Sequence, residues 1–427
     1  MNAPTESSST ERRSSATGAA SPNSSMDQLL EQTRRNITHS VAGTVPLDDA
    51  IVRVPATNYT DPVRWQLEID RIFRRLPLVL GFSAELPTPN SYKASEVMGT
   101  PVLLTRGEDG VLRSFVNMCS HRGAIVAEAG HGTARRFSCP YHAWTYDPKG
   151  DLVGILDKAN FGEFDWSCHG LTPLPVWERA GIIFGGITPA LTGEQTCLDV
   201  DLTLAGYDQF LEHLSLDTCT YVGQQSVDGP NWKLAYDGYL DFYHLPILHK
   251  NTFGSDYNNK TINDAWGPHQ RNVQPDARFA SLHGTAEETW TAARITTGIW
   301  TIFPHVSIAS FEAGGRLFMI SQLLPGPTPG TSVTTQFFLA AFDPTDEQRE
   351  LITQRMEFLL HVVRDEDYAT GLGIQRALMT GAKKEFLFGR NEGPCQRFHG
   401  WVENLVAAET MADTASLFDA AVEFHHP

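Results

Sequence analysis

Two short cysteine–histidine pairs are notable in the sequence because their residue types and spacing are those of an iron–sulfur site. Cys119 is separated from His121 by one residue, and Cys139 is separated from His142 by two. Two thiolates on one iron and two imidazoles on the other form the ligand set of a Rieske [2Fe–2S] cluster. The pattern therefore predicts a protein that transfers electrons.

The mixed ligand set has a consequence for the reduction potential. Two ferric ions, two sulfides and two thiolates add to zero charge if the histidines are neutral, whereas four thiolates would leave the cluster negative. An electron enters a neutral cluster more easily, so histidine ligation raises the potential. The outer nitrogens of the two imidazoles can still donate hydrogen bonds, which can connect the cluster to another site.

A structural zinc site is the main alternative for these four residues. Two cysteines and two histidines can hold zinc tetrahedrally, although zinc ligand pairs more often have two to four residues between them. A disulfide is less favoured, because the chain has only six cysteines in 427 residues and no sign of secretion. The other cysteines are scattered singly, which indicates packed or free thiols: Cys168, Cys197, Cys219 and Cys395.

A second group of candidate ligands follows the sequence Asn-Trp-Lys, which begins at Asn231. Asp241 and His244 are three residues apart and would share one face of a helix. The next histidine, His249, follows His244 by five residues, a spacing that separates two side chains by about 140° on a regular helix. Pro246 lies between them and is expected to kink the helix, so that both imidazoles can reach one ion. Two histidines with one carboxylate form the facial triad of non-haem Fe(II) oxygenases.

The carboxylate of this triad is expected from a long helix that opens with a capping box at Thr345–Gln348. The apolar stripe of this helix consists of Ile352, Met356, Leu359, Leu360 and Val363. Asp367 is expected to continue this stripe, because it follows the last of these residues by four. A buried acid needs a partner, and a salt bridge or a helix cap explains it as well as a metal does. Glu366 is the second candidate, whereas Asp365 points away from this face.

Composition limits the kind of partner that the chain can have. Its formal net charge is −17, which argues against nucleic acid as a ligand and weakly favours a basic electron donor. The longest uncharged stretch, 295–311, is typical of a strand, so no membrane span is expected. The first 25 residues are rich in Ser, Thr, Ala and Pro without an apolar run. They predict a disordered tail rather than an export signal, and the protein is expected to be cytoplasmic.

The rest of the pattern indicates which elements position these ligands. Helices are expected at Met26–Arg35 and from Asp61–Pro62 onward. From Leu78 short strands and turns dominate, with a hairpin turn at 107–110, and each ligand pair is expected at a loop tip. Three later segments predict one antiparallel sheet: Ile299–Phe311, Leu317–Leu324 and Ser332–Phe342. No internal repeat is visible, and no glycine-rich turn predicts an NAD or flavin module.

Together these features resemble the catalytic α subunit of the ring-hydroxylating Rieske non-haem iron oxygenases. The resemblance covers roughly Leu78 to the C-terminus, and both motifs occur in the family's order. It implies an α+β fold, in which a β-rich Rieske domain is joined to a helix-grip catalytic domain made of an antiparallel sheet and a long helix. The implied ranges are a disordered tail (1–25), a helical segment packed on the catalytic domain (26–77), the Rieske domain (78–190) and the catalytic domain (191–427).

The resemblance also implies a role for each candidate residue. The cluster ligands would be Cys119, His121, Cys139 and His142. The ligands of a mononuclear Fe(II) would be His244, His249 and Asp367. Asp241 would link His244 to His142 of a neighbouring subunit and carry electrons between chains, so that a homotrimer is part of the mechanism. One departure is Asp237-Gly238, because many members of the family carry Asn shortly before the bridging acid.

The function predicted on this basis is that of the terminal oxygenase component of a multicomponent system. Electrons from NAD(P)H would arrive through a separate flavin reductase, a ferredoxin or both, with O₂ as cosubstrate. A small organic substrate, preferably aromatic, would be cis-dihydroxylated or monohydroxylated, and β subunits are left open. The alternatives are oxidative demethylation, hydroxylation of an alicyclic or steroid-like compound, a Rieske electron carrier without oxygenase chemistry, and a structural zinc protein.

Overall fold

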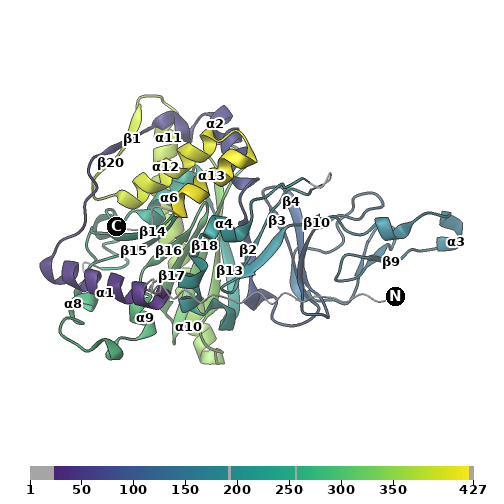
Figure 1. Cartoon of the computed structure of the whole chain (residues 1–427), viewed down its shortest axis with the longest axis horizontal. Coiled ribbons are helices and arrows are strands. Elements are labelled where there is room, and N and C mark those ends of the chain that lie inside the picture. Colours follow the sequence, from purple (N-terminus) through teal and green to yellow (C-terminus); the bar gives the residue numbers. More distant parts are fainter. Residues whose placement is uncertain (1–23, 191–193, 255–256, 423–427) are drawn as a thin grey trace, which may run out of the picture.

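The computed structural model describes residues 24–190, 194–254 and 257–422. Figure 1 shows a broad body that contains most of the helices, and a narrower arm that extends from it and ends at α3 (Lys158–Phe161). The body contains a seven-stranded sheet and the arm contains two smaller sheets. Mixed helix and antiparallel sheet confirm the predicted α+β class.

The arm consists of two small antiparallel sheets around their own apolar core. The larger sheet has the order β10-β5-β4-β3-β6, with β3 at Ser91–Val97, β4 at Thr100–Arg106, β5 at Leu112–Val116, β6 at Gly130–Thr133 and β10 at Pro173–Leu174. The smaller one contains β7 (Phe137–Ser138), β8 (Thr145–Tyr146) and β9 (Leu152–Gly154). The predicted hairpin turn at 107–110 joins β4 to β5.

The body is organised around a fully antiparallel sheet of order β13-β19-β18-β17-β16-β15-β14. Its strands are β13 (Thr220–Gly229), β14 (Ile262–Trp266), β15 (His269–Val273), β16 (Ile299–Ile302), β17 (Val306–Glu312), β18 (Arg316–Pro325) and β19 (Ser332–Ala340). The prediction of one continuous strand at Ile299–Phe311 is wrong. Pro304 cannot donate to a strand ladder, and the chain turns there between β16 and β17.

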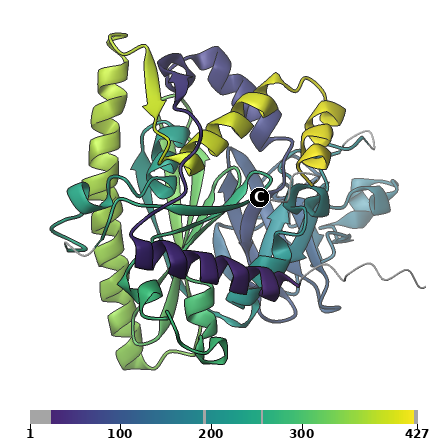
Figure 2. The same ribbon diagram turned by 60° about the vertical axis from the view of Figure 1, so that its left-hand side comes forward.

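A long helix runs along one side of this sheet, and Figure 2 shows it upright in green and yellow-green. It begins as α10 (Asp346–His361), where Thr345 and Gln348 form the predicted capping box. It continues without a break through a π-helical segment, η8 (Val362–Tyr368), into α11 (Ala369–Leu378). The third candidate ligand therefore lies in a stretch of irregular helix, and π-helical turns are frequent at functional sites.

The N-terminal helices pack on the body. The first, α1 (Ser25–Ala42), is longer than the predicted Met26–Arg35: Ser24 caps it in a capping box with Asp27, and it continues beyond Arg35 to Ala42, before Gly43 in a left-handed conformation. The predicted tail, 1–25, lies outside the described residues except for its last two. The second helix, α2 (Pro62–Glu68), starts after Asp61 as predicted and continues as a π-helical turn, η2 (Ile69–Phe73).

The remaining elements link these parts. A small sheet of β2 (Leu78–Phe82), β12 (Ile182–Gly185) and β11 (Val176–Arg179) joins arm and body, and β1 (Val52–Pro55) pairs with β20 (Glu385–Phe388). The other helices are α4 (Val200–Leu204), α5 (Asp208–Leu211), α6 (Trp232–Leu240), α7 (Leu245–Leu248), α8 (Ala277–Ala280), α9 (Ala292–Ile295), α12 (Gly393–Ala407) and α13 (Met411–Val422). The predicted domain boundaries stay a prediction.

Candidate metal centres

Two loops of the arm carry the predicted cluster ligands, and they fold in the same way. In each loop the cysteine amide donates a hydrogen bond of 2.8 Å to the backbone carbonyl of the residue that follows it by five positions. The amide four residues after Cys119 or Cys139 donates back to the cysteine carbonyl. The residues at this returning position, Gly123 and Ala143, have φ angles of 82° and 58°. Equivalent tight turns thus present both cysteine–histidine pairs.

The four side chains fit the donor set of a Rieske cluster. The rings of His121 and His142 lie 4.7 Å apart, and both Nδ1 atoms are buried without a hydrogen-bond partner among the described residues. Burial alone would raise the pKa of the Cys139 thiol, but the amides of Tyr141 and His142 and the side chain of Cys119 outweigh it and lower that pKa. Two orphaned imidazole nitrogens and a stabilised thiolate are what the iron atoms of the cluster require.

Two further side chains surround these ligands and were missed by the sequence analysis. Trp144 stacks on His121, with the ring centroids 4.8 Å apart and an angle of 9° between the planes. The hydroxyl of Tyr146 lies 3.2 Å from Cys119 Sγ. Burial and this thiol raise the pKa of Tyr146 to about 12, so the hydroxyl stays protonated and can donate to the sulfur. Hydrogen bonds to ligand sulfurs tune the reduction potential of such clusters.

The second predicted group of ligands converges in the body. His244 Nε2 lies 3.2 Å from His249 Nε2 and 3.6 Å from Asp367 Oδ1. His249 Nε2 lies 3.1 Å from the same carboxylate oxygen. The three atoms lie within 4.8 Å of one another, which is close enough for one ion to contact all of them. The donor set suits iron, because two imidazoles and one carboxylate form the facial triad.

Carboxylates behind the two histidines fix which ring nitrogens face the centre. His244 Nδ1 lies 3.2 Å from Asp241 Oδ2, and His249 Nδ1 lies 2.7 Å from Glu366 Oε2. A carboxylate can only accept, so each Nδ1 carries the proton and each Nε2 presents a lone pair to the centre. Glu366 also accepts from the hydroxyl of Thr252 at 2.9 Å. Glu366 therefore contacts the far side of His249, whereas Asp367 faces the centre.

The backbone around the histidines differs from the kinked helix that was expected. Helix α6 ends at Leu240, and Asp241 has an extended conformation with φ −92° and ψ 117°. The short helix α7 then begins after His244 and ends before His249, with Pro246 in its first turn. Proline is tolerated there because the amide it lacks would be unpaired in any case. The two imidazoles meet because the helix stops and restarts, not because proline bends it.

The charge around the second centre suits a cation. Burial would lower the pKa of His249, but its contacts with Asp367 and Glu366 outweigh burial and raise that pKa. In the absence of a metal a proton is the cation available to this cluster of acceptors. A divalent ion at the same point would be held by one carboxylate and two imidazole nitrogens.

Comparison with known protein families supports both centres. The model of the Rieske [2Fe-2S] domain matches residues 77–165, and the model of the ring hydroxylating alpha subunit (catalytic domain) matches residues 216–408. The chain belongs to the Rieske non-haem iron oxygenases. Members of this family carry a Rieske cluster and a mononuclear iron, and the donor sets described above fit both groups.

Curated relatives of this oxygenase include both monooxygenases and dioxygenases. The carnitine monooxygenase oxygenase subunit of Escherichia coli (strain K12) is 28% identical over 347 residues, which cover 76% of this chain and 84% of the relative. The anthranilate 1,2-dioxygenase large subunit of Burkholderia cepacia is 32% identical over 281 residues, 64% of this chain and 62% of the relative. The glycine betaine monooxygenase oxygenase subunit of Chromohalobacter salexigens is 29% identical over 204 residues, and this chain spans only 44% of its length.

Solved structures share the fold of this oxygenase. The quaternary ammonium Rieske monooxygenase CntA in complex with L-carnitine has a TM-score of 0.68 at 22% identity, covering 83% of this chain and 95% of that chain. Naphthalene 1,2-dioxygenase from Rhodococcus sp. bound to indole has a TM-score of 0.68 at 20% identity, covering 90% and 99%. In this oxygenase, no helix within the described ranges is long and apolar enough to cross a membrane.

The Asn-Trp-Lys sequence noted above anchors α6 rather than contacting the metal centre. The Asn231 side chain caps α6 by accepting from the amide of Lys233 at 2.9 Å. Trp232 Nε1 and Lys233 Nζ both donate to the carboxylate of Glu68, in a fully buried cluster. One turn before Asp241, Asp237 accepts from Tyr59 and His399 at 3.1 and 2.9 Å. These contacts hold α6 in place, and the candidate iron ligands follow directly after the end of this helix.

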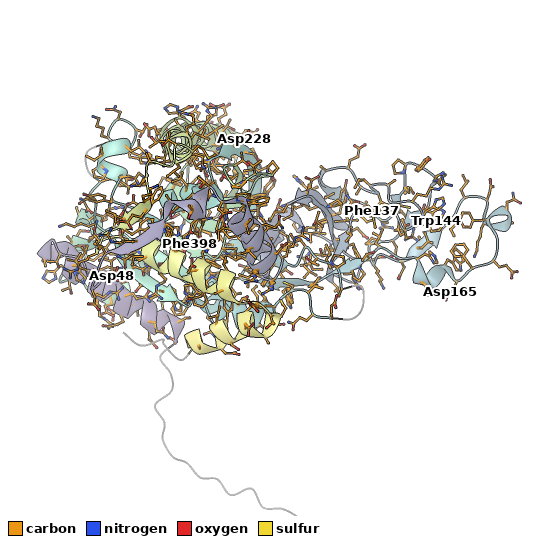
Figure 3. The ribbon with its side chains drawn as sticks, turned by 90° about the horizontal axis from the view of Figure 1, so that it is seen from above. Asp48, Phe137, Trp144, Asp165, Asp228 and Phe398 are labelled. Carbon is orange, nitrogen blue, oxygen red and sulfur yellow. The ribbon has the colours of Figure 1, made fainter. Side chains whose placement is uncertain are left out.

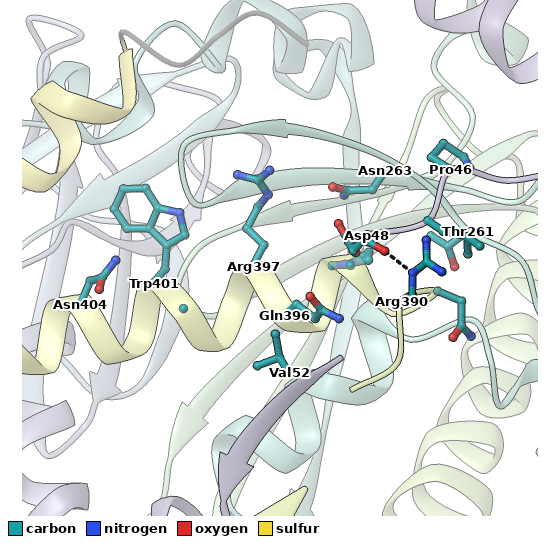
Figure 4. A pocket seen from close by; sticks show the side chains of 15 residues that line it. Pro46, Asp48, Val52, Thr261, Asn263, Arg390, Gln396, Arg397, Trp401 and Asn404 are labelled. Atoms are coloured by element: carbon teal, nitrogen blue, oxygen red, sulfur yellow. Dashed lines mark hydrogen bonds between the residues drawn. The ribbon is translucent and has the colours of Figure 1, made fainter. Parts of the chain in front are cut away.

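Two cavities of about 560 Å³ each lie in the body. Figure 4 shows the first, where Gln396, Arg397 and Trp401 project from α12 and Arg390 donates to the backbone carbonyl of Asp48. The second lies beside the convergent ligands and is lined by Phe242, Leu245 and Phe253, among other residues. Only the second cavity is placed to hold a substrate next to the candidate iron site.

Proposed function

We propose that this oxygenase is the terminal component of a multicomponent Rieske system and that seven predicted metal ligands, together with Asp241, carry its chemistry. The cluster ligands are Cys119, His121, Cys139 and His142. The ligands of the mononuclear iron are His244, His249 and Asp367. The observation that carries the proposal is the convergence of two imidazole nitrogens and one carboxylate oxygen in a chain that also holds a complete cysteine–histidine set.

When bound, the cluster supplies electrons one at a time and the mononuclear iron supplies a site for activating O₂. The residues of the chain prepare that site. Asp241 and Glu366 accept hydrogen bonds from the Nδ1 protons of His244 and His249. The Nε2 atom of each ring, which faces the iron site, therefore has no proton to lose when iron binds. The carboxylate of Asp367 offsets part of the metal charge.

Electrons reach the iron site from the cluster of a neighbouring copy of the chain, through Asp241. Within one chain the two centres lie in different parts. Trp144 of the cluster loop lies in the arm, whereas Phe398, which packs on the helix α6 that leads to the iron ligands, lies in the body (Figure 3). Asp241 is partly exposed, with 22% of its side chain accessible, and it accepts hydrogen bonds from His244 Nδ1 and from the amide of Tyr243. The outer nitrogen of His142 in the neighbouring copy is a donor that this carboxylate can accept from.

This path requires the arm of one chain to rest on the body of the next, as in a homotrimer. Apolar side chains are exposed on both of the surfaces that would form this contact. Near the cluster loops they are Met118, Tyr141, Leu156 and Phe161. Near Asp241 they are Tyr243 and Ile247, the latter 75% exposed. A head-to-tail contact between two different surfaces closes into a ring when its rotation allows, which suits a trimer.

The electrons come from NAD(P)H through a separate flavin reductase, a ferredoxin or both. The names of the relatives support separate components, since they are called an oxygenase subunit and a large oxygenase component. The acidic surface, with a net charge of −17, suits a donor with a basic docking face. Whether β subunits accompany the trimer is left open, and a cytoplasmic location stays a prediction.

The substrate is a small organic molecule, preferably aromatic, that is cis-dihydroxylated or monohydroxylated. Similarity to the anthranilate dioxygenase favours the aromatic class. The second candidate is a monooxygenase outcome such as oxidative demethylation or hydroxylation of an alicyclic or steroid-like compound. Similarity to the carnitine and glycine betaine monooxygenases favours the monooxygenase branch.

Incorporation of ¹⁸O₂ tests this function. The purified chain would be supplied with NADH, a reductase and a ferredoxin from a related system, and a panel of aromatic and quaternary ammonium compounds. We expect substrate-dependent NADH consumption and a product that carries one or two labelled oxygen atoms. His249→Ala is the matched control, which should keep the cluster signal and form no labelled product. Labelled product from the His249→Ala variant, or none from the wild type with any compound, would contradict the proposal.

A further inference from the structure

Residues that flank or contact the candidate iron ligands line the neighbouring cavity. Phe242 and Leu245 line it on either side of His244 in sequence. The ring of Phe253 also lines it, and its centroid lies 5.3 Å from that of His249 and 5.8 Å from that of Phe358. A molecule in this cavity would rest on an apolar wall next to the imidazoles.

The lining of the same cavity is also strongly basic. Its lining includes four arginines and a single acidic residue: Arg278, Arg294, Arg316, Arg355 and Glu312. The chain as a whole has 33 basic and 50 acidic residues, so this concentration of arginine is opposite in sign to the rest of the molecule. Arginine is the side chain best shaped to bind a carboxylate, because its planar group can donate two parallel hydrogen bonds.

Among the residues that the structure describes, most of these arginines have no carboxylate partner in an ion pair. Arg278 is paired with Asp276. For Arg294, Arg316 and Arg355, no salt bridge to a described residue is formed. Arg355 instead lies over the ring of Phe358, 5.4 Å from its centroid.

Arg316 is the most informative of the three. It is partly buried in β18, donates one hydrogen bond of 3.0 Å to the hydroxyl of Thr296, and lies over the ring of Phe318. Its strand neighbour Glu312 is exposed and forms no salt bridge with it among the described residues. Burial lowers the pKa of Arg316, and the charges of Cys219 and Glu312 offset this effect only in part. A cation in this position is compensated most directly by an anion in the cavity.

We infer that the substrate of this oxygenase carries a carboxylate, held by Arg316 with Arg294 and Arg355 nearby, while its carbon skeleton lies on the apolar wall towards His244 and His249. The inference rests on the proposed function and narrows its substrate class. An aromatic acid and a carboxylate that also bears a quaternary ammonium group share this anion. They differ in the part that would lie against Phe242 and Phe253.

Binding measurements on the metal-loaded protein under anaerobic conditions test the inference without turnover. Two matched pairs of probes would be titrated by calorimetry: benzoate against benzamide, and glycine betaine against choline. In each pair only the first has the carboxylate. We expect at least one carboxylate to bind about 10- to 100-fold more tightly than its uncharged or cationic counterpart, as charge-assisted hydrogen bonds would give. Preference for benzoate would indicate an aromatic acid, and preference for glycine betaine would indicate an ammonium carboxylate.

Variants locate the interaction. Arg316→Gln should weaken the preferred carboxylate about 10-fold or more, and Arg316→Lys should restore part of the affinity because the charge remains. Arg294→Gln is the second variant, in case the substitution in β18 prevents folding. Arg390→Gln is the matched control, because Arg390 lines the other cavity of the same volume. This control should bind the carboxylate as the wild type does.

The outcomes separate the inference from the proposed function. Iron and sulfide content and the cluster spectrum would be measured on every sample used for binding. If iron and sulfide are present but neither carboxylate binds better than its counterpart, or both cavity variants bind as well as wild type, the inference is wrong and the oxygenase function stands. If the purified wild-type chain holds no iron–sulfur cluster, the proposed function itself fails.

Discussion

At the point where the three candidate iron ligands meet, two adjacent carboxylates have different surroundings. Asp367 Oδ1 lies within 3.6 Å of both facing histidine nitrogens. Glu366 reaches the opposite nitrogen of one ring and a threonine hydroxyl. The first carboxylate is placed to contact a metal directly, and the second is placed to hold the ring that does so.

Substitution of the two acids should therefore have different effects on iron. Asp367→Ala removes a ligand, so we expect about two irons per chain, those of the cluster, instead of about three. Glu366→Gln keeps the shape of the side chain and loses its charge, so we expect iron affinity to fall about 10- to 100-fold with all three irons recoverable in excess ferrous ion. Iron content and ferrous titration after anaerobic dialysis would measure both. The assignment would be reversed if the glutamate variant lost the third iron permanently and the aspartate variant kept it.

The cluster ligands and the two candidate iron-ligating histidines could be predicted from sequence because they occur in local pairs. The cluster pairs and His244 with His249 are short spacings whose chemistry is legible in one dimension. The role of Glu366 could not be predicted, because its contact with His249 joins residues 117 positions apart. Tyr146 was missed for the same reason, since nothing in its neighbourhood indicates that it reaches a cysteine in another loop.

At the scale of the elements, the structure differs from the prediction in the backbone conformation of the segments that carry the candidate ligands, not in the choice of candidate ligands. Periodicity placed Asp367 on the buried stripe of the long helix, and the segment that carries it is π-helical. A single extra residue in a turn rotates the side chains that follow, and a 3.6-residue repeat does not reveal it. In the same way, the local sequence allowed Pro246 to lie inside a kinked helix or at the start of a new one.

A histidine at the junction between arm and body gives the fold a dependence on pH. His305 lies fully buried at the start of β17, where its Nε2 accepts a 3.2 Å hydrogen bond from the amide of Val79 in β2. Burial lowers its pKa from 6.5 to about 3. The unfolded chain therefore takes up a proton below pH 6.5 that the folded protein excludes, and stability falls as the pH decreases through that window.

We expect the wild type to lose about 2 kcal/mol more than His305→Gln between pH 7.5 and pH 5, from 1.36 kcal/mol for each pH unit below the unfolded pKa. Glutamine can still accept the Val79 hydrogen bond but does not titrate. Urea unfolding of both proteins at the two pH values would measure the difference. Equal losses in the two proteins would mean that His305 is not the group responsible.

At the scale of the whole molecule, the two candidate centres belong to different apolar cores, although the larger sheet of the arm also contributes Val97, Val102 and Leu104 to the core of the body. The cluster ligands Cys119 and Cys139 are part of the core of the arm, whereas the helix that leads to the iron ligands packs in the main core of the body. Electron delivery between chains follows from this division if the arm of one chain contacts Asp241 of another. The sequence could indicate this arrangement only through the family resemblance, because no residue pattern encodes which chain supplies each partner.

Mixed oligomers test the direction of electron flow. Asp241→Ala should keep the cluster, retain the mononuclear iron in excess ferrous ion, and block turnover, and Cys139→Ser should remove the cluster and block turnover as well. Coexpressed in one cell, the two variants should restore roughly a quarter of the wild-type activity, since one contact in four would pair an intact cluster with an intact Asp241. No activity in the mixture, with both variants shown to be in the same oligomers, would place the electron path within a single chain.

The central claim is that one chain holds two different iron centres. The most direct measurement is the iron, sulfide and zinc content of the anaerobically purified protein, combined with its low-temperature EPR spectrum after reduction. The account predicts about three irons and two sulfides per chain, no stoichiometric zinc, and a Rieske signal on reduction that is lost in Cys139→Ser but kept in His249→Ala. Zinc without sulfide in a colourless protein would contradict it.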